Sequence, residues 1–303
     1  MPHADALREL APVAHSLIER HLGNAKEWFP HELVPWGRGR DFTPGEAWRP
    51  EDAPMDEAVR SSLFVNLLTE DNLPHYFRTI AHVFGDDDPW HTWSHRWTAE
   101  EGRHSIVIRD YLTVTRAVDP VALERARMTQ VCKGEVPQPS TPADALVYVS
   151  LQELATSIAH RNTGRLLTDE VGRKVMARVA GDETLHHVFY RDLTTALLEI
   201  DPSTTVLAID RNVRDFAMPG TGIPNFIEHA KAIANAGIYD FAAHHDLILE
   251  PVVLQTWKLE SVEGLTPEAE AARERCLKHI GKVARVARRA NERRGQARET
   301  DAA

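Results

Sequence analysis

Two stretches of the chain carry the same arrangement of side chains that can bind metal ions. Each copy consists of one glutamate followed, about thirty residues later, by a Glu-x-x-His motif: Glu70, Glu101 and His104 in the first, Glu153, Glu183 and His186 in the second. The glutamates lie 31 residues apart in the first copy (70 to 101) and 30 in the second (153 to 183). One Glu-x-x-His occurs often by chance on helical surfaces, but two copies with matching spacing predict a shared site.

The chemistry of that site follows from helix geometry. Positions i and i+3 lie on one face of an α-helix, so the Glu and His of each motif can point at the same spot. Four carboxylates and two imidazoles from four helices form a ligand set that suits a pair of iron or manganese ions inside a helical bundle. If the six residues were only exposed helix charges, six coincidences would be required.

The residues around these motifs resemble a known family. The matching stretches are Leu68-Thr-Glu-Asp-Asn-Leu-Pro74, Trp97-Thr-Ala-Glu-Glu-Gly-Arg-His104, Gln152-Glu-Leu-Ala-Thr156 and Gly181-Asp-Glu-Thr-Leu-His186. Together they resemble the soluble acyl-[acyl-carrier-protein] desaturases, both the plant stearoyl type and its actinobacterial relatives, over roughly residues 30–250. Two departures are modest: Gly102 stands where the family usually has Asn, and His75 where the plant enzymes have Thr.

The resemblance implies a fold and a ligand set. The expected fold is all-α, a ferritin-like di-iron four-helix bundle core with additional helices. The expected iron ligands are Glu70, Glu101, His104, Glu153, Glu183 and His186. Glu101 is preferred to its neighbour Glu100, because the second motif also has its glutamate three residues before the histidine.

Other residues are candidates for supporting roles. Thr156 lies one turn after Glu153, and the resemblance puts it on the oxygen-binding side of the irons, although it could instead bond its own helix. Asp182 could accept the second ring N–H of a ligand histidine. The resemblance also implies a tryptophan on a route from the surface to the iron through this aspartate, and Trp36 is the nearest counterpart, or else a loop anchor.

Further positions leave two interpretations open. Thr69 is a weaker candidate for a channel wall. His160 shares a face with Glu153, but a core histidine that only satisfies its hydrogen bonds is equally compatible. His186 is preferred to His187 as the ligand. The remaining histidines at 91, 95, 244 and 245 are expected to be surface or packing residues.

The pattern along the chain is almost entirely helical. Helices are expected near 4–22, 56–84, 90–117, 120–132, 142–166, 168–199, 203–216, 224–236 and 266–293. We expect a single ferritin-like domain over 1–303, with an ordered loop at 29–55, a break at 219–224 and a flexible tail at 294–303.

Composition excludes several classes of protein. The 303 residues are 43% hydrophobic and 26% charged, and no apolar run approaches the length of a membrane span. The N-terminus shows no secretory signal, which favours a cytoplasmic location. The two cysteines, Cys132 and Cys276, cannot hold an iron–sulfur cluster, and no Gly-x-Gly-x-x-Gly fingerprint is present. Electrons must therefore come from a separate partner.

Charge is unevenly distributed in a chain whose net charge is −10. Ten Lys or Arg residues lie between Arg273 and Arg298, against only Glu274 and Glu292. This segment could be a solvated helix end, or a surface that docks an acidic partner such as acyl carrier protein. Nucleic acid is a third possibility, but no recognition motif accompanies the charge.

The expected activity is O2-dependent desaturation. The resemblance implies that two iron ions, O2 and two electrons introduce a cis double bond into an acyl chain carried by acyl carrier protein. It also implies a ferredoxin-type electron donor and a homodimer. One rival is another di-iron protein, for iron storage or for radical generation in a ribonucleotide reductase; the reductase tyrosine position holds Ile108, and the nearest tyrosine is Tyr111. Another rival is a non-catalytic protein that binds acyl carriers.

Overall fold

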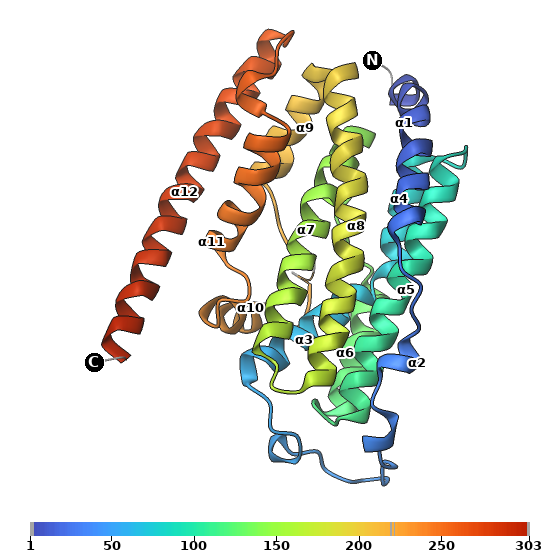
Figure 1. Ribbon diagram of the computed structural model, residues 1–303, viewed down its shortest axis with the longest axis vertical. Helices are drawn as coiled ribbons and strands as arrows, with labels where there is room; N and C mark the ends of the chain where they lie inside the picture. The colour runs from blue at the N-terminus through green and yellow to red at the C-terminus, as the bar shows by residue number, and fades with distance from the viewer. Residues whose placement is uncertain (1–2, 219, 221, 302–303) are drawn as a thin grey trace.

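Four helices at the centre of the computed structural model carry all six predicted ligands (Figure 1). They are α3 (Glu57–Glu70), α5 (Trp90–Val114), α7 (Pro142–Leu166) and α8 (Glu170–Ile200). The structure describes residues 3–218, 220 and 222–301, and in that part of the chain it contains no β-strand. The prediction of an all-α fold with a four-helix core is confirmed.

Local sequence signals start three of these helices. The Asp56 carboxylate accepts hydrogen bonds from the first free amides of α3, and Asp169 does the same for α8. At α7 the Thr141 hydroxyl accepts from the Asp144 amide, and Pro142 follows at the first helical position. Such caps satisfy amides that have no partner within the helix, so the start of each helix is fixed by its own sequence.

The expected helix over 56–84 is wrong, because the structure divides it in two. α3 ends at Glu70, and α4 (Leu73–Phe84) begins after a short turn. The reason is Pro74, which has no amide N–H and whose ring clashes with the carbonyl four residues earlier, that of Glu70. The break therefore falls directly after a predicted ligand and leaves Glu70 at the end of its helix.

The remaining elements surround this core. They are α1 (His3–Asn24), α2 (Pro30–Leu33), η1 (Trp36–Arg38), η2 (Pro50–Asp52), α6 (Pro120–Lys133), α9 (Pro202–Arg214), α10 (Phe226–Asn235), α11 (Phe241–His244), η3 (His245–Thr256), η4 (Leu259–Ser261) and α12 (Pro267–Asp301). Helices α1 and α12 lie on opposite sides of the molecule (Figure 1). The sequence pattern predicts no helix over 245–256, where the structure has the π-helical segment η3 with Pro251 inside it.

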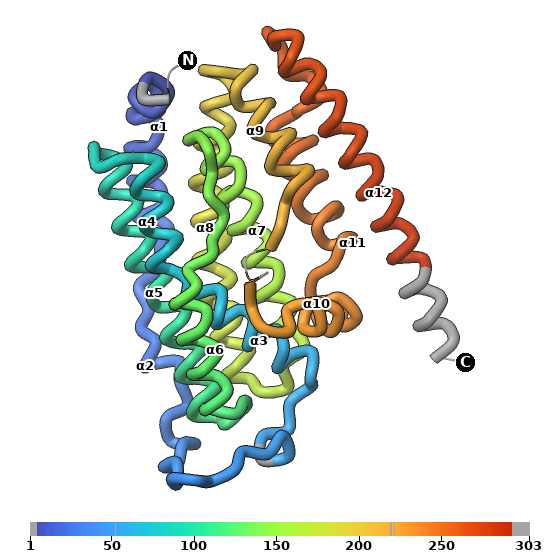
Figure 2. Tube along the Cα trace, turned by 180° about the vertical axis from the view of Figure 1, so that it is seen from behind, coloured from blue at the N-terminus to red at the C-terminus, as the bar shows by residue number. Residues whose placement is uncertain are grey.

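The loop expected at 29–55 passes around one end of the bundle (Figure 2). Arg116 ties it down from the end of α5: its guanidinium donates to the Asp41 carbonyl at 2.8 Å and lies 4.0 Å from the centre of the Phe42 ring. In return, the Trp48 indole donates to the Arg116 carbonyl at 2.7 Å. These contacts join the loop to the end of α5, the helix that carries the predicted ligands Glu101 and His104.

Three organisational predictions have different outcomes. The break expected at 219–224 falls between α9 and α10, although residues 219 and 221 lie outside the described residues. The expected tail at 294–303 falls on the end of α12, where the side chains lie outside the described residues; its flexibility stays a prediction, as does the single domain. None of the described helices is long and apolar enough to cross a lipid bilayer.

Among the described residues, the two larger of three hydrophobic clusters lie toward opposite ends of the bundle. On α5 the first cluster reaches Trp97 and the second begins at Val107. On α8 the second cluster ends at Val179 and the first resumes at Phe189. The Glu-x-x-His motifs occupy the helix positions between the clusters. Close packing on both sides therefore holds a polar layer across the middle of the bundle.

Candidate metal centre

The six predicted ligands meet in that polar layer. They form two groups of four whose ligating atoms lie within 4.8 Å of one another: Glu70, Glu101, His104 and Glu183, and Glu101, Glu153, Glu183 and His186. All six residues are buried. Glu101 and Glu183 belong to both groups, whereas each group has its own histidine and its own further glutamate.

The two shared glutamates face both histidines. One oxygen of Glu101 lies 3.2 Å from His104 Nδ1, and its other oxygen lies 2.7 Å from His186 Nδ1. Glu183 repeats this arrangement, with one oxygen 3.4 Å from His104 Nδ1 and the other 3.9 Å from His186 Nδ1. Carboxylates that present one oxygen to each of two neighbouring positions can bridge two metal ions.

The two unshared glutamates are held in equivalent ways. Glu70 has one oxygen 3.8 Å from His104 Nδ1, and His160 contacts its other oxygen at 3.1 Å. Glu153 has one oxygen 3.8 Å from His186 Nδ1, and the Trp97 indole donates to its other oxygen at 3.1 Å. In each case a ring nitrogen fixes one oxygen and leaves the second for the centre.

The donor set fits metal ions because its inward-facing atoms lack other partners. Among the residues that the structure describes, 14 buried side-chain atoms have no hydrogen-bond partner, and five of them lie at this centre: Oε1 of Glu101, Nδ1 of His104, Oε2 of Glu153, Oε2 of Glu183 and Nδ1 of His186. Buried polar atoms without partners are rare, because each costs free energy. Here all five belong to the two groups, and they are the oxygen and imidazole donors that iron and manganese accept.

The pKa values of the buried glutamates also indicate that the site needs positive charge. Burial, opposed in part by His160, raises the pKa of Glu70 to about 7. Burial and the charge of Glu183 raise the pKa of Glu153 well above its ordinary value. Four carboxylates gathered away from water repel one another, and divalent cations between them would remove that repulsion.

A carboxylate lies behind each ligand histidine. His104 Nε2 lies 3.4 Å from an oxygen of Asp182, and His186 Nε2 lies 3.0 Å from an oxygen of Glu100. Burial alone would raise the pKa of Glu100, but its hydrogen bonds with His186 and His21 lower that pKa far below the ordinary value. The ionised carboxylate accepts a hydrogen bond from the N–H at Nε2. The other ring nitrogen, Nδ1, therefore faces the centre with the lone pair that can bind a metal ion.

The structure separates the neighbouring candidates. Glu101 points inward, while Glu100 points away and serves as the outer partner of His186. His187 lies on another face of α8, where its Nδ1 donates to the Ser150 carbonyl at 2.7 Å. Of the paired candidates, only the preferred member of each lies in the two groups.

Trp36 is not the tryptophan that contacts Asp182. Its side chain is half exposed, and its indole donates to the His31 carbonyl at 2.9 Å. Trp28 takes that position instead, since its indole donates to Asp182 at 2.8 Å. The alternative interpretation of Trp36 as a loop anchor fits the structure.

Thr156 and Thr69 line two apolar pockets that flank the centre. One pocket extends among α4, α7 and the loop before α7, and includes Tyr76 and Tyr148. The other extends toward α10 and includes Phe226. Glu70 and both threonines line both pockets. The Thr156 hydroxyl donates to the carbonyl of Glu153 at 3.0 Å, so its own helix is its present partner.

Comparisons with known proteins agree with this geometry. Residues 3–303 match the family model described as fatty acid desaturase. DesA1 of Mycobacterium tuberculosis, which is named as an acyl-[acyl-carrier-protein] desaturase, is 40% identical over 278 residues, which cover 88% of this chain and 82% of the relative. The chloroplastic stearoyl-[acyl-carrier-protein] 9-desaturase of Gossypium hirsutum is 31% identical over 315 residues, which cover 96% of this chain and 78% of the relative.

A solved structure supports the same assignment. The X-ray structure of DesA2 from M. tuberculosis, titled as an acyl-ACP desaturase, superposes with a TM-score of 0.72 at 28% identity. The match covers 88% of this chain and 99% of that one. The helical bundle, the two overlapping ligand groups and the whole-length match lead to one conclusion: this chain belongs to the fatty acid desaturase family.

Proposed function

We propose that this protein is an acyl-[acyl-carrier-protein] desaturase. It uses two iron ions, O2 and two electrons to introduce a cis double bond into a fatty acyl chain. The observation that carries the proposal is the pair of shared glutamates, Glu101 and Glu183, because each presents one oxygen to either histidine. The names of the relatives support the substrate class.

The six ligands hold the metal ions, and the rest of the chain prepares the surroundings. When bound, the iron pair supplies the O2-dependent oxidation that removes two hydrogen atoms from neighbouring carbons of the acyl chain. The two apolar pockets place that chain beside Glu70, and their apolar walls keep water away from it. A chain held in this way presents the same pair of carbons at each turnover.

Two further residues take supporting roles in this proposal. Thr156 lies one turn after Glu153 and lines both pockets. Its hydroxyl can rotate away from the carbonyl of its own helix and donate a hydrogen bond to a polar group beside the metal ions. Asp182 fixes the ring of His104 and connects it to Trp28, which belongs to the segment between α1 and α2. Electrons from a ferredoxin-type donor would arrive on this side.

The partners follow from the same proposal. The acyl carrier protein remains outside while its acyl chain enters the pockets, so it must dock on the protein surface. The resemblance to the desaturases further supports a homodimer, and the cytoplasmic location stays a prediction. Light scattering on the purified protein would measure the mass of the assembly, and a monomer at working concentrations would count against the dimer.

The function is tested by product analysis. Iron-loaded protein is incubated with saturated acyl carrier substrates of several chain lengths, reduced ferredoxin and O2, and the acyl products are analysed by mass spectrometry. We expect products lighter by two hydrogen atoms, formed only with O2 and absent with the folded Glu183→Ala variant. Iron-loaded, folded protein that leaves every acyl chain unchanged would show that the protein is not a desaturase.

A further inference from the structure

One short segment lies behind both ligand histidines. His21 belongs to the last turn of α1, and Trp28 follows the end of that helix. The His21 ring is stacked beside His186 with centroids 5.8 Å apart, and the Trp28 ring is stacked beside His104 with centroids 6.4 Å apart. Two residues seven positions apart in the chain therefore place an aromatic ring next to each ligand histidine.

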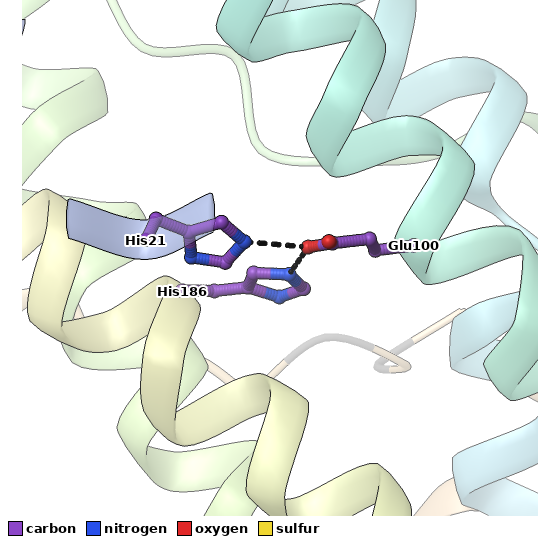
Figure 3. A group of neighbouring side chains, drawn as sticks. All are labelled: His21, Glu100 and His186. Atoms are coloured by element: carbon purple, nitrogen blue, oxygen red, sulfur yellow. Dashed lines mark hydrogen bonds and ion pairs between the residues drawn. The ribbon is translucent and has the colours of Figure 1, made fainter. Parts of the chain in front are cut away.

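On the His186 side, two histidines share one carboxylate oxygen (Figure 3). Oε2 of Glu100 lies 3.0 Å from His186 Nε2 and 2.9 Å from His21 Nε2. Arg96 donates to the other oxygen of Glu100 at 2.6 Å. Both oxygens of this carboxylate therefore accept hydrogen bonds from N–H donors.

His21 both packs in the core and supplies a hydrogen bond. Its side chain is buried, with the Trp93 ring against its edge at a centroid distance of 5.0 Å. Its second nitrogen, Nδ1, is buried without a hydrogen-bond partner. A purely apolar side chain at this position would avoid that cost. What the imidazole adds is the N–H that holds Glu100 in place.

The other side of the centre is built in the same way. Oδ2 of Asp182 lies 3.4 Å from His104 Nε2 and accepts from the Trp28 indole at 2.8 Å. Arg103 donates to the same oxygen at 3.2 Å. On each side, one carboxylate contacts a ligand histidine and also accepts a hydrogen bond from a second ring N–H. That second ring is His21, at the end of α1, on one side and Trp28, after α1, on the other.

We infer that His21 is a positioning residue for His186. Through Glu100 it fixes the orientation of the His186 ring, so that Nδ1 faces the metal position formed with Glu101, Glu153 and Glu183. The inference rests on the proposed metal centre and adds a residue to it. Through this hydrogen bond, the docking of α1 affects the site that contains His186.

Cobalt titration of the metal-free protein tests this inference one site at a time. Glu70→Ala removes a ligand of the His104 group, and Glu153→Ala removes a ligand of the His186 group, so each background favours one site. In the Glu70→Ala background, His21→Phe should weaken Co²⁺ binding roughly tenfold, as loss of an outer hydrogen-bond partner does. In the Glu153→Ala background, His21→Phe should leave the Co²⁺ affinity unchanged.

Two matched variants separate positioning from general stability. His21→Gln retains an N–H donor and should recover most of the affinity, whereas Trp28→Phe should weaken binding only in the Glu153→Ala background. If His21→Phe does not fold, as judged by circular dichroism, His21→Met takes its place. Equal weakening in both backgrounds, or none in either, would overturn the inference. Wild-type protein that binds no Co²⁺ would instead contradict the proposed metal centre.

Discussion

Glu101 and Glu183 come from different helices, yet each turns one oxygen to His104 and the other to His186. Glu101 lies on α5 and Glu183 on α8. Both are the first residue of a Glu-x-x-His motif, so the repeat in the sequence becomes an approximate symmetry about the centre. The unshared glutamates, Glu70 and Glu153, lie outside the pair at equal distances of 3.8 Å from their histidines.

Loss of a shared glutamate should therefore cost more metal than loss of an unshared one. Glu101→Ala removes a donor from both groups, and we expect the iron content of the reconstituted protein to fall toward zero. Glu70→Ala or Glu153→Ala removes a donor from one group only, and each variant should retain about half of the iron. Metal analysis of folded variants measures this, and equal losses in all three would contradict the bridging arrangement.

Asp182→Asn should slow turnover more than it lowers iron binding. The change removes a charge behind His104 and weakens the link to Trp28, but it leaves all six ligands in place. Turnover with ferredoxin as the electron donor is compared with iron content and with the melting temperature. A variant that turns over at the wild-type rate would remove Asp182 from the proposed electron route.

Acid should destabilise the protein through His244. This histidine is buried against Phe216, and burial, together with the charges of His245 and His279, lowers its pKa from 6.5 to about 4. Between these pH values the unfolded chain binds a proton that the folded protein does not bind. The free energy of unfolding therefore falls as the pH drops from 6.5 to 4, by about 3 kcal/mol from this residue.

The comparison is made with His244→Phe, which keeps a ring against Phe216 but cannot titrate. Urea unfolding at several pH values gives the free energy of unfolding for both proteins. The difference between wild type and variant should be constant above pH 6.5 and should shift in favour of the variant below it. Parallel curves over the whole range would show that His244 does not contribute to acid sensitivity.

The basic face of α12 should assist docking of the acyl carrier. Arg285, Arg288 and Arg289 are exposed on this helix, away from the core. Attraction to an acidic carrier is screened over a Debye length of about 8 Å at physiological salt and acts mostly on association. Reversing these three charges should raise KM and flatten its salt dependence, with kcat nearly unchanged. An unchanged KM and salt slope would exclude this face.

Sequence reasoning could group the six predicted ligands because their spacing is local. Glu101 and His104 share a helix face whatever the rest of the chain does, and the second motif repeats that relationship. The supporting residues are different. His21 meets Glu100 across 79 residues, and Trp28 meets Asp182 across 154. Only the folded path of the chain at and after the end of α1 brings these partners together. The prediction that Trp36 is the tryptophan beside Asp182 was therefore wrong.

Backbone details were predictable where one residue dominates. Pro74 is visible in the sequence, and its clash with the Glu70 carbonyl could have divided the helix expected over 56–84. No helix was expected over 245–256, where the structure has a π-helical segment with Pro251 inside it. Glu100 carried a usable signal, since it lies beside a ligand on α5, but its role depends on where His186 lies on α8.

Mössbauer spectroscopy of the iron-loaded protein tests the central claim most directly. In the proposed centre, the shared glutamates would hold two iron ions side by side in each chain. We predict two iron ions per chain whose oxidised spectrum is that of a magnetically coupled pair, because bridged ions interact. A folded protein that holds one iron ion per chain, or two that show no magnetic coupling, would contradict the account.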